Sequence, residues 1–450
     1  MKLTSFKAYD VRGRIPDEIN EPLAYDIGRA FVTFVKPKRV AVGYDIRLSS
    51  PQLASALKRG ITESGCDVLD IGLWGTEGIY FATAFEALDG GIMVTASHNP
   101  PDYNGMKFVR EGSRPVSGDT GLKDMQAMIE SGHLPPIADK PGTERKLDVR
   151  KKYIEHLLSY VDRSKLRKLK VVVNPGNGGA GAIIEQLAPQ LPFEFVKVHF
   201  EADGTFPNGV PNPMLEENRA STAEAIRLSG ADIGLAWDGD YDRCFFFDEH
   251  GTFIEGYYLV GLLAEAFLKR EPGARIVHDP RLTWNTIDIV SKHGGTPVLC
   301  KSGHAFIKQK MREVDAAYGG EMSAHHYFRN FAYCDSGMIT WLLVLQVMIE
   351  RGLTLSQLVG ERMRLFPASG EINRKLAGDA KAVLARAQRQ YERQALAVDF
   401  TDGLSMEFAD WRFNLRGSNT EPLVRLNVES RGNQALMREK TAEVLRLVDG

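Results

Sequence analysis

The sequence predicts an α/β protein with three related α/β domains, whose sheets are mixed and largely parallel, and a smaller α+β domain at the C-terminus. Three observations lead to this prediction. The order strand, helix, strand occurs three times, the chain has the length of about three or four ordinary domains, and the pattern changes after residue 372. Strands that alternate with helices usually form parallel sheets with helices on their faces.

The three α/β units share one plan. They are expected at 39–45, 49–65 and 67–72, then at 170–175, 181–191 and 193–200, and then at 275–280, 283–295 and 296–302. In the first unit we expect Ser50 to cap the helix, Pro51 to take its first position and Gly65 to end it, because these residue types favour those places.

The last part of the chain follows a different pattern. A helix rich in alanine and arginine precedes two segments, 411–415 and 423–430, and a closing helix follows them. Alternation of polar and apolar residues in the two segments predicts half-exposed strands. The charged segment 139–153 and the passage near Glu255 are the expected joints. The predicted domains are 1–150, 151–252, 253–367 and 368–450.

The composition excludes several classes of partner. The net charge is −2 and the basic residues are dispersed, so the chain lacks the footprint of a protein that binds nucleic acid or an anionic membrane. We therefore expect a small-molecule partner and no obligatory protein partner. The N-terminus has no apolar core of a secretory signal, and the longest apolar stretch, 337–349, is too short to cross a bilayer. Four widely spaced cysteines without a CxxC pair argue against a disulfide framework or a zinc site, and the cytoplasm is the expected location.

A glycine-rich loop, "GNGGAG" at 176–181, follows a predicted strand and opens a helix. It fits the dinucleotide-binding pattern GxGxxG, and Glu201 stands about where a ribose-binding acid would be expected. Glycines are also the usual solution for a tight turn between a strand and a helix. No nicotinamide chemistry is visible near the loop, and there is no phosphate-binding GxxxxGK[ST] motif. Dinucleotide binding is therefore the weaker interpretation.

An acidic triplet lies between two apolar runs. Asp238, Asp240 and Asp242 alternate along a loop, so that all three carboxylates can turn toward one point. Two such charges about 4 Å apart repel by roughly 4 kcal/mol at an effective dielectric near 20, which favours a bound cation. Oxygen ligands favour Mg²⁺ or Ca²⁺. Glu249 stands at the twelfth position of a calcium loop, but Arg243 stands where that loop requires glycine.

Arg243 suggests a phosphate near the predicted ion, because a guanidinium can hold phosphate with two hydrogen bonds. A solvated acidic turn is the alternative interpretation of the triplet.

Three other loops carry polar side chains that could bind a ligand. Ser97 comes three residues after the apolar run 90–94, and the end of a strand is a rigid mount for functional groups. Glu321, Ser323 and His325 alternate, so in an extended loop they would present one face to a polyhydroxyl ligand. The third loop, 416–422, combines an arginine, hydroxyls and an amide as a possible phosphate cradle. Each loop could also be an ordinary polar turn.

Taken together, these loops indicate a family. The segments "TASHNP", "DGDYDR", "GEMSAHH" and "RGSNTEP" occur in this order, one in each predicted domain, and with them the chain resembles the α-D-phosphohexomutase family. The resemblance covers essentially the whole chain and includes "KAYDVRG", "NGMK", "HDPRLTWNT" and "KSGHAFIK". Within the family it is greatest to bacterial phosphomannomutases that also act as phosphoglucomutases. It implies four domains around a central cleft.

The resemblance also implies a mechanism. Ser97 would carry a phosphoryl group, and Mg²⁺ would be held by Ser97, Asp238, Asp240 and Asp242. The enzyme would interconvert mannose 6-phosphate and mannose 1-phosphate through a 1,6-bisphosphate, which also serves as activator, and would act on glucose phosphates. Lys107 and His325 are the expected acid and base groups, and His98 would shape the serine loop. The expected substrate contacts are Tyr9, Arg12, Arg243, Arg281, His304, Glu321, Ser323, His325, Arg416, Ser418, Asn419 and Thr420.

Two alternatives remain open. The chain could be a phosphoglucosamine mutase, although Met322 stands where that branch has glutamine. Separately, Ala324 departs from the family as a whole, because it replaces a glycine that is common after the serine of the sugar-binding loop. The chain could also be a catalytically silent protein that binds sugar phosphates on the same scaffold. The presence of both Ser97 and the acidic triplet disfavours a silent protein.

Overall fold

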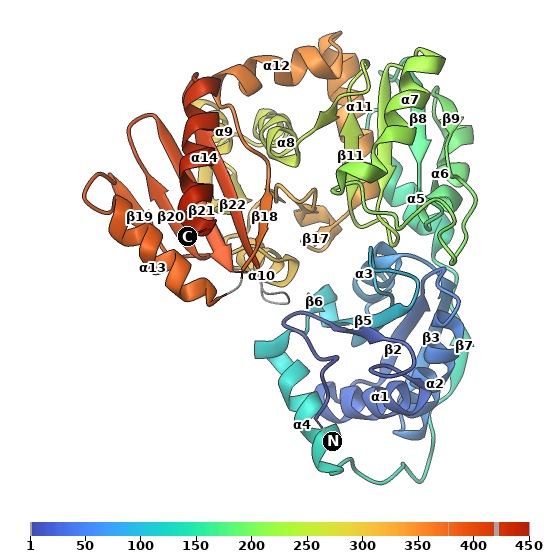
Figure 1. Cartoon of the computed structure of the whole chain (residues 1–450). Helices are drawn as coiled ribbons and strands as arrows, with labels where there is room; N and C mark the ends of the chain where they lie inside the picture. Colours follow the sequence, from blue (N-terminus) through green and yellow to red (C-terminus); the bar gives the residue numbers. More distant parts are fainter. Residues whose placement is uncertain (1, 377, 418–422, 450) are drawn as a thin grey trace. The chain divides into compact units, whose positions relative to one another are not determined.

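The computed structural model describes residues 2–376, 378–417 and 423–449 (Figure 1). By compactness the chain divides into two units. The first unit is Met1–Phe253 with Asn330–Gly352, and the second unit is Ile254–Arg329 with Leu353–Gly450. One boundary therefore lies next to Glu255, where a joint was expected. The four domain limits expected from the sequence remain a prediction.

The first sheet of the first unit has the strand order β1-β5-β4-β2-β3-β7, with β6 beside β5. Its strands are β1 (Val11–Arg14), β2 (Arg39–Tyr44), β3 (Asp67–Leu73), β4 (Gly90–Val94), β5 (Tyr103–Arg110), β6 (Arg114–Pro115) and β7 (Glu144–Lys146). Its helices are α1 (Glu21–Val35), α2 (Ser50–Glu63), α3 (Thr76–Phe85) and α4 (Lys123–Ser131). β2 runs parallel to β3 and β4, whereas β5 is antiparallel to β1 and β4, so the sheet is mixed as predicted.

Helix α2 begins one residue before the predicted position. Ser49, not Ser50, is the residue at its N-cap, and its backbone is already helical. Ser50 is the first residue of the helix, and its buried hydroxyl donates a hydrogen bond of 2.6 Å to Oδ1 of Asp45. The predicted end is confirmed, since Gly65 follows the helix with a φ of +88°, a conformation that favours glycine.

The second sheet has the order β12-β11-β10-β8-β9. Its strands are β8 (Lys170–Asn174), β9 (Glu194–Lys197), β10 (Ile233–Trp237), β11 (Cys244–Phe247) and β12 (Phe253–Ile254), and the neighbouring helices are α5 (Arg150–Leu158), α6 (Ala180–Leu187), α7 (Ala220–Ser229) and α11 (Gly337–Arg351). β8 pairs in parallel with both β9 and β10, whereas β10 and β11 are antiparallel.

The second unit contains the third α/β sheet, in which β14-β13-β15-β16 are neighbours. The strands are β13 (Arg275–His278), β14 (Thr296–Leu299), β15 (Tyr318–Gly320) and β16 (His326–Phe328), with helices α8 (Gly256–Arg270), α9 (Trp284–Lys292), α10 (His304–Val314) and α12 (Leu355–Leu365). The short strand β17 (Cys334–Asp335) lies in residues of the first unit. β13 is parallel to β14 and β15, as the third repeat predicts.

The C-terminal sheet has the order β18-β22-β21-β20-β19, with antiparallel neighbours (Figure 1). Its elements are β18 (Ile372–Lys375), α13 (Ala380–Tyr391), β19 (Ala397–Asp399), β20 (Leu404–Glu407), β21 (Trp411–Gly417), β22 (Leu423–Ser430) and α14 (Gln434–Asp449). The α+β prediction is therefore confirmed.

The prediction that β21 and β22 are half exposed is wrong. Apolar side chains of both strands pack with α13 and α14, and polar residues on the strands are buried as well. Arg412 and Glu429 form an ion pair of 2.8 Å, and Arg412 also donates to the backbone oxygens of Pro280 and Arg281. A polar residue therefore occupies a buried position here because its partners come from a distant segment.

Among the described residues, no single helix is both long enough and apolar enough to cross a membrane. A longer apolar length arises only when the consecutive helices α11 and α12 are counted together across the break between them.

Candidate active site

Ser97 lies in the loop between β4 and β5, and its side chain is buried. Its hydroxyl is 3.1 Å from Oδ2 of Asp238 and 3.0 Å from Nδ1 of His98. Its backbone N–H donates to Oγ1 of Thr95, 2.9 Å away. Ser97 has a φ of +49°, a left-handed conformation that is uncommon for a residue with a side chain and persists only where the surroundings fix it.

Arg47 fixes the conformation of the serine loop. Its buried guanidinium donates to the backbone oxygens of Ser97 and Asn99, at 3.0 and 2.6 Å, and to those of Pro100 and Tyr103, at 2.7 and 3.0 Å. A single side chain thus satisfies four carbonyl groups of one loop. Arg47 was not predicted from the sequence, although it follows the end of β2 just as Ser97 follows the end of β4.

The three aspartates come together as expected. Asp238, Asp240 and Asp242 follow β10, and oxygen atoms from the three carboxylates lie within 4.8 Å of one another. All three side chains are buried. In the described part of the chain, Oδ1 of Asp240 has no hydrogen-bond partner. Three carboxylates, one of which has an unpaired buried oxygen, and a hydroxyl 3.1 Å from Asp238 form a donor set that fits a hard divalent cation.

Lys107 provides the positive charge nearest to this cluster. Its Nζ lies 2.8 Å from Oδ2 of Asp240 and 2.6 Å from Oδ2 of Asp242. Burial opposes a charge on Lys107, but the two carboxylates outweigh burial and raise the pKa of the ammonium group. Burial likewise opposes a charge on Asp240, and Lys107 holds the pKa of that carboxyl below its usual range. Lys107 therefore stays a protonated ammonium group that donates hydrogen bonds to both carboxylates.

Arg243 connects the acidic cluster to the serine loop. Its Nε donates to Oδ2 of Asp238 at 2.8 Å, and its terminal nitrogen contacts Nδ1 of His98. Burial raises the pKa of Asp238 to about 7, against the opposing effect of Arg243. Burial and the nearby Arg243 hold the pKa of His98 well below its usual range, so His98 is neutral at pH 7. Because a guanidinium can only donate, Nδ1 of the neutral His98 ring is an acceptor, and it can accept a hydrogen bond from the Ser97 hydroxyl.

The N-terminal segment contributes two further predicted residues to the first unit. Arg12, on β1, donates to Oδ1 of Asn99 at 2.8 Å and pairs with Asp10 at 2.5 Å. The guanidinium is therefore attached to the loop that carries Ser97. Tyr9 precedes β1 and is half buried.

In the second unit, Arg281 holds the predicted sugar-binding groups together. Its guanidinium lies 3.1 Å from Oε2 of Glu321 and 3.0 Å from Oγ of Ser323. The alternation of these residues was interpreted for an extended loop, but the loop is not extended. It is a turn, closed by a hydrogen bond of 2.9 Å from the N–H of Glu321 to the oxygen of His325, with Ala324 at a φ of +69°. Glu321 and Ser323 thus meet at one guanidinium instead of along the face of a strand.

His304 and His325 also lie together in the second unit. His304 is the first residue of α10, and the centres of the two imidazole rings are 6.4 Å apart. Both side chains are half buried. The predicted histidines thus form one imidazole pair beside the turn that carries Glu321.

Arg416, at the end of β21, is held by two carboxylates. It lies 3.0 Å from Oε2 of Glu371 and 3.4 Å from Oδ2 of Asp402. Glu371 also pairs with Arg281 and Arg425, each at 3.5 Å, and was not identified from the sequence. The remaining predicted members of this loop, Ser418, Asn419 and Thr420, lie outside the described residues.

Glu77 follows Thr76, which contacts the acidic cluster, and Glu77 was also not predicted from the sequence. This buried residue of α3 accepts hydrogen bonds from the hydroxyls of Tyr153 and Ser336, at 2.6 and 2.5 Å, and from the N–H of Met338 at 3.1 Å. It thereby joins α3, α5 and the start of α11. Its neighbour Thr76 donates to Oδ2 of Asp240 at 2.5 Å. The network thus supports the loop that carries the aspartates.

Glu77 should make stability depend on pH. Burial raises its pKa from 4.5 to about 8, so the folded state binds a proton that the unfolded state releases. Stability from this group is complete below about pH 4.5 and falls as the pH rises to about 8. The loss is a few kcal/mol, at about 1.4 kcal/mol per pKa unit. Glu77→Gln removes the titration, so its thermal midpoint should rise relative to wild type over this pH range.

The matched control for this experiment is the exposed Glu111→Gln, whose thermal midpoint should follow that of wild type at every pH. A difference between Glu77→Gln and wild type that stays constant from pH 5 to pH 9 would rule out the raised pKa.

Comparison with known proteins agrees with this arrangement. Models of phosphoglucomutase/phosphomannomutase α/β/α domains I, II and III match residues 3–133, 151–251 and 255–366, and the model of the C-terminal domain matches 371–447. The chain is 59% identical to a phosphomannomutase of Salmonella montevideo, over 99% of each chain. It is 58% identical to the phosphohexose mutases of Xanthomonas campestris pv. campestris (strain B100), over the full length of both.

A solved structure extends the likeness to three dimensions. A phosphoglucomutase/phosphomannomutase family protein from Burkholderia thailandensis superposes with a TM-score of 0.90 at 32% identity, over 99% of this chain and 97% of that one. The match includes every predicted domain and the segments that carry Ser97 and the aspartates. This chain belongs to the phosphoglucomutase/phosphomannomutase family.

Proposed function

We propose that this protein is a phosphomannomutase that interconverts mannose 6-phosphate and mannose 1-phosphate and also acts on glucose phosphates. One observation carries the proposal. The Ser97 hydroxyl lies 3.1 Å from Asp238, within a buried cluster of three carboxylates, in a chain that is 58–59% identical throughout to phosphomannomutases. A hydroxyl beside a cation site suits reversible phosphoryl transfer, because the hydroxyl can carry the group and a cation stabilises its charge.

Ser97 would carry the phosphoryl group. Its hydroxyl, once phosphorylated, and the carboxylates of Asp238, Asp240 and Asp242 would hold Mg²⁺. When bound, this ion would neutralise charge on the transferring group. Ser97 gives its phosphoryl group to the free hydroxyl of the hexose phosphate and accepts the other phosphoryl group once the resulting 1,6-bisphosphate has turned around. Free hexose 1,6-bisphosphate would activate the enzyme by phosphorylating Ser97.

Proton transfer is assigned to two residues. Lys107 is an ammonium group and can donate a proton, and His325 would accept the proton of the attacking hydroxyl. His98 and Arg243 would hold Ser97 in position. Tyr9, Arg12, His304 and Arg281 would contact the sugar phosphate in addition to these groups.

The second unit would bind the parts of the substrate that do not react. Glu321 and Ser323 would contact the 3- and 4-hydroxyls of the sugar, which nearly exchange places when the ring is turned end for end. Arg416, with Ser418, Asn419 and Thr420, would hold the phosphate that is not transferred. One set of groups can then serve both orientations of the intermediate. The 2-hydroxyl, where mannose and glucose differ, is not assigned a partner, which supports activity on both sugars.

A comparison of substrates tests the proposal. We expect similar kcat/KM values for mannose 1-phosphate and glucose 1-phosphate and a much lower value for glucosamine 1-phosphate, in assays coupled to detection of each 6-phosphate. A preference for glucosamine 1-phosphate would favour the phosphoglucosamine mutase alternative. Absence of turnover with all three sugars would indicate a silent binding protein.

Arg416→Lys tests the phosphate assignment. Lysine keeps the charge but loses the planar fork that can hold Glu371 and a phosphate at once, so KM for mannose 1-phosphate should rise about tenfold, with a smaller change in kcat. Arg374→Lys, on β18 of the same sheet, is the matched control, because its ion pair with Asp449 is exposed. A KM unchanged by Arg416→Lys would place the phosphate elsewhere.

We also propose the cytoplasm as the location, because the four cysteines, which are buried and free, suit a reducing compartment. The four domains are proposed at 1–150, 151–252, 253–367 and 368–450.

A further inference from the structure

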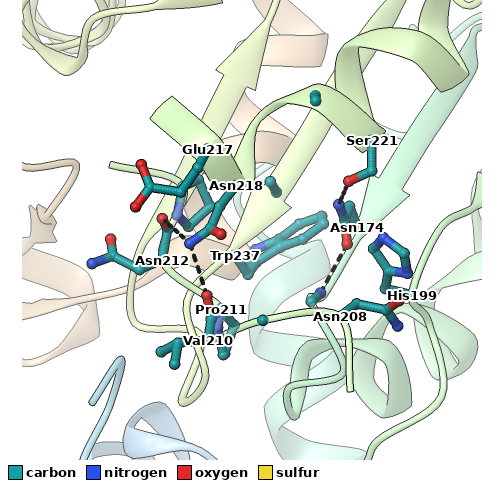
Figure 2. A pocket seen from close by; sticks show the side chains of 15 residues that line it. Asn174, His199, Asn208, Val210, Pro211, Asn212, Glu217, Asn218, Ser221 and Trp237 are labelled. Carbon is teal, nitrogen blue, oxygen red and sulfur yellow. Dashed lines mark hydrogen bonds between the residues drawn. The ribbon is translucent and has the colours of Figure 1, made fainter. Parts of the chain in front are cut away.

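A pocket of about 230 Å³ lies in the first unit, at the carboxyl ends of β8 and β10 (Figure 2). Asn174 ends β8 and Trp237 ends β10, and both line the pocket. Figure 2 shows Trp237 between a side formed by Asn212 and Asn218 and a side that includes Asn174 and His199. None of these five residues belongs to the site proposed for phosphoryl transfer.

The topology of the second sheet favours a ligand at this place. β8 has a parallel neighbour on each side, β9 and β10, and the chain passes from β8 through α6 to β9 and then through α7 to β10. The strand order therefore reverses between β8 and β10. In open α/β sheets, the crevice outside the carboxyl ends of the strands at such a switch point is where ligands bind.

The packing around the glycine-rich loop excludes the dinucleotide binding that the GxGxxG pattern suggested. A pyrophosphate would need to approach the glycine loop closely, but a Cβ added at Gly176 would lie 2.8 Å from Cβ of Pro211. One added at Gly178 would lie 3.0 Å from the oxygen of Gly239. These glycines therefore allow close packing of Pro211 and Gly239, and the protein itself fills the space where a pyrophosphate would lie. The remaining pocket is smaller than the roughly 300–1,000 Å³ of sites for drug-sized ligands.

The lining suits a neutral ligand. Neither lysine nor arginine is among the described residues that line the pocket, whereas Glu217 adds a negative charge. Burial lowers the pKa of His199, so its ring is neutral at pH 7. A phosphate dianion would meet a carboxylate here without any cation to balance it. The pocket is thus distinct in its chemistry from a site for hexose phosphates.

The polar groups of the lining are both donors and acceptors. Among the described residues, Nε1 of the fully buried Trp237 has no hydrogen-bond partner, although burying such a group unpaired is costly. Asn218 uses its Nδ2 for the backbone oxygens of Val210 and Asn212, at 2.9 and 3.0 Å, which leaves Oδ1 as an acceptor in the described part of the chain. The neutral ring of His199 offers one donor and one acceptor. Hydroxyl groups, which donate and accept, match such a mixture.

We propose that the pocket between the carboxyl ends of β8 and β10 binds a neutral polyhydroxyl ligand of monosaccharide size, with the buried Trp237 beneath the ligand as part of the pocket wall. The topology provides the crevice, the packed glycines limit its size, and the lining selects against phosphate. Binding of a ligand in this pocket does not depend on whether the protein has the proposed mutase activity.

The indole N–H signal of Trp237 tests the proposal. The chain has five tryptophans, so single Trp→Phe substitutions assign the indole region of a ¹H–¹⁵N spectrum, by elimination if Trp237→Phe does not fold. Unphosphorylated D-mannose and D-glucose are the probes, and at least one of them should shift the Trp237 signal saturably in the millimolar range. Inorganic phosphate at the same concentrations should leave it in place. The proposal fails if neither sugar moves this signal, or if phosphate moves it equally.

A matched pair of variants on α7 shows whether the sugar is in the pocket. Ala220 is exposed and lines the pocket, so Ala220→Trp should block it and weaken the sugar-dependent shift at least about tenfold. Glu224, one turn further along the helix, is exposed and does not line the pocket, so Glu224→Trp should respond as wild type does. Circular dichroism and thermal midpoints confirm that both variants are folded. An undiminished shift in Ala220→Trp would place the sugar elsewhere and overturn the proposal.

Discussion

Ser97→Ala is expected to carry no phosphoryl group and to lose mutase turnover by at least about 10³-fold, as removal of a covalent nucleophile does in other enzymes. Alanine has no oxygen to accept the phosphoryl group, and neighbouring residues cannot replace it, since Arg47 and Thr95 hold the loop in one conformation. Intact mass spectrometry after incubation with hexose 1,6-bisphosphate measures the phosphorylation. A coupled assay with mannose 1-phosphate measures kcat.

Ser49→Ala is the matched control for Ser97→Ala. Ser49 is a nearby serine whose hydroxyl accepts a hydrogen bond from Asn104, 2.8 Å away, and it is not part of the acidic cluster. This variant should gain the mass of one phosphoryl group and keep turnover near the wild-type value. If Ser97→Ala still became phosphorylated, or retained turnover, the carrier would be another residue and the proposed mechanism would be wrong.

The sequence predicts the elements of this fold well because most of its signals are local. The alternation of strands and helices follows from short apolar runs and from turn residues such as Gly65. The meeting of the three aspartates follows from their spacing on a loop between two strands. Such features depend on neighbours within a few residues, which a single sequence contains.

The features that sequence reasoning missed depend on contacts between distant segments. Arg412 and Glu429 are buried because each pairs with the other on the neighbouring strand. Alternation of residue types along one strand does not contain this pairing, and so it predicted exposure. Arg47 binds carbonyl groups that lie 50 to 56 residues further along the chain. Signals for two of the missed residues were nevertheless present. Arg47 follows the end of a strand, and Glu77 is a lone charge in the otherwise uncharged helix α3, a pattern that indicates a buried polar partner.

Removal of divalent cations should abolish turnover of the wild-type protein, and added Mg²⁺ should restore it. Asp240→Asn should resist this rescue. The substitution keeps the shape of the side chain but removes the charge that balances a cation and pairs with Lys107. A cation contributes several kcal/mol to charge stabilisation in such reactions, so kcat should fall by roughly 10²–10⁴-fold at a Mg²⁺ concentration that saturates wild type. The measurement is turnover of mannose 1-phosphate against Mg²⁺ concentration after treatment with chelator.

Asp248→Asn separates loss of the cation from loss of a buried aspartate. Asp248 is buried beyond β11 and accepts the N–H groups of His250 and Thr252, at 2.9 and 2.8 Å, outside the acidic cluster. This variant should be less stable than wild type but should need the same Mg²⁺ concentration for half-maximal turnover. Wild-type turnover that survives chelation would exclude a catalytic cation. Equal Mg²⁺ requirements for Asp240→Asn and wild type would mean that Asp240 supports the loop through Thr76 and Lys107 instead of binding the ion.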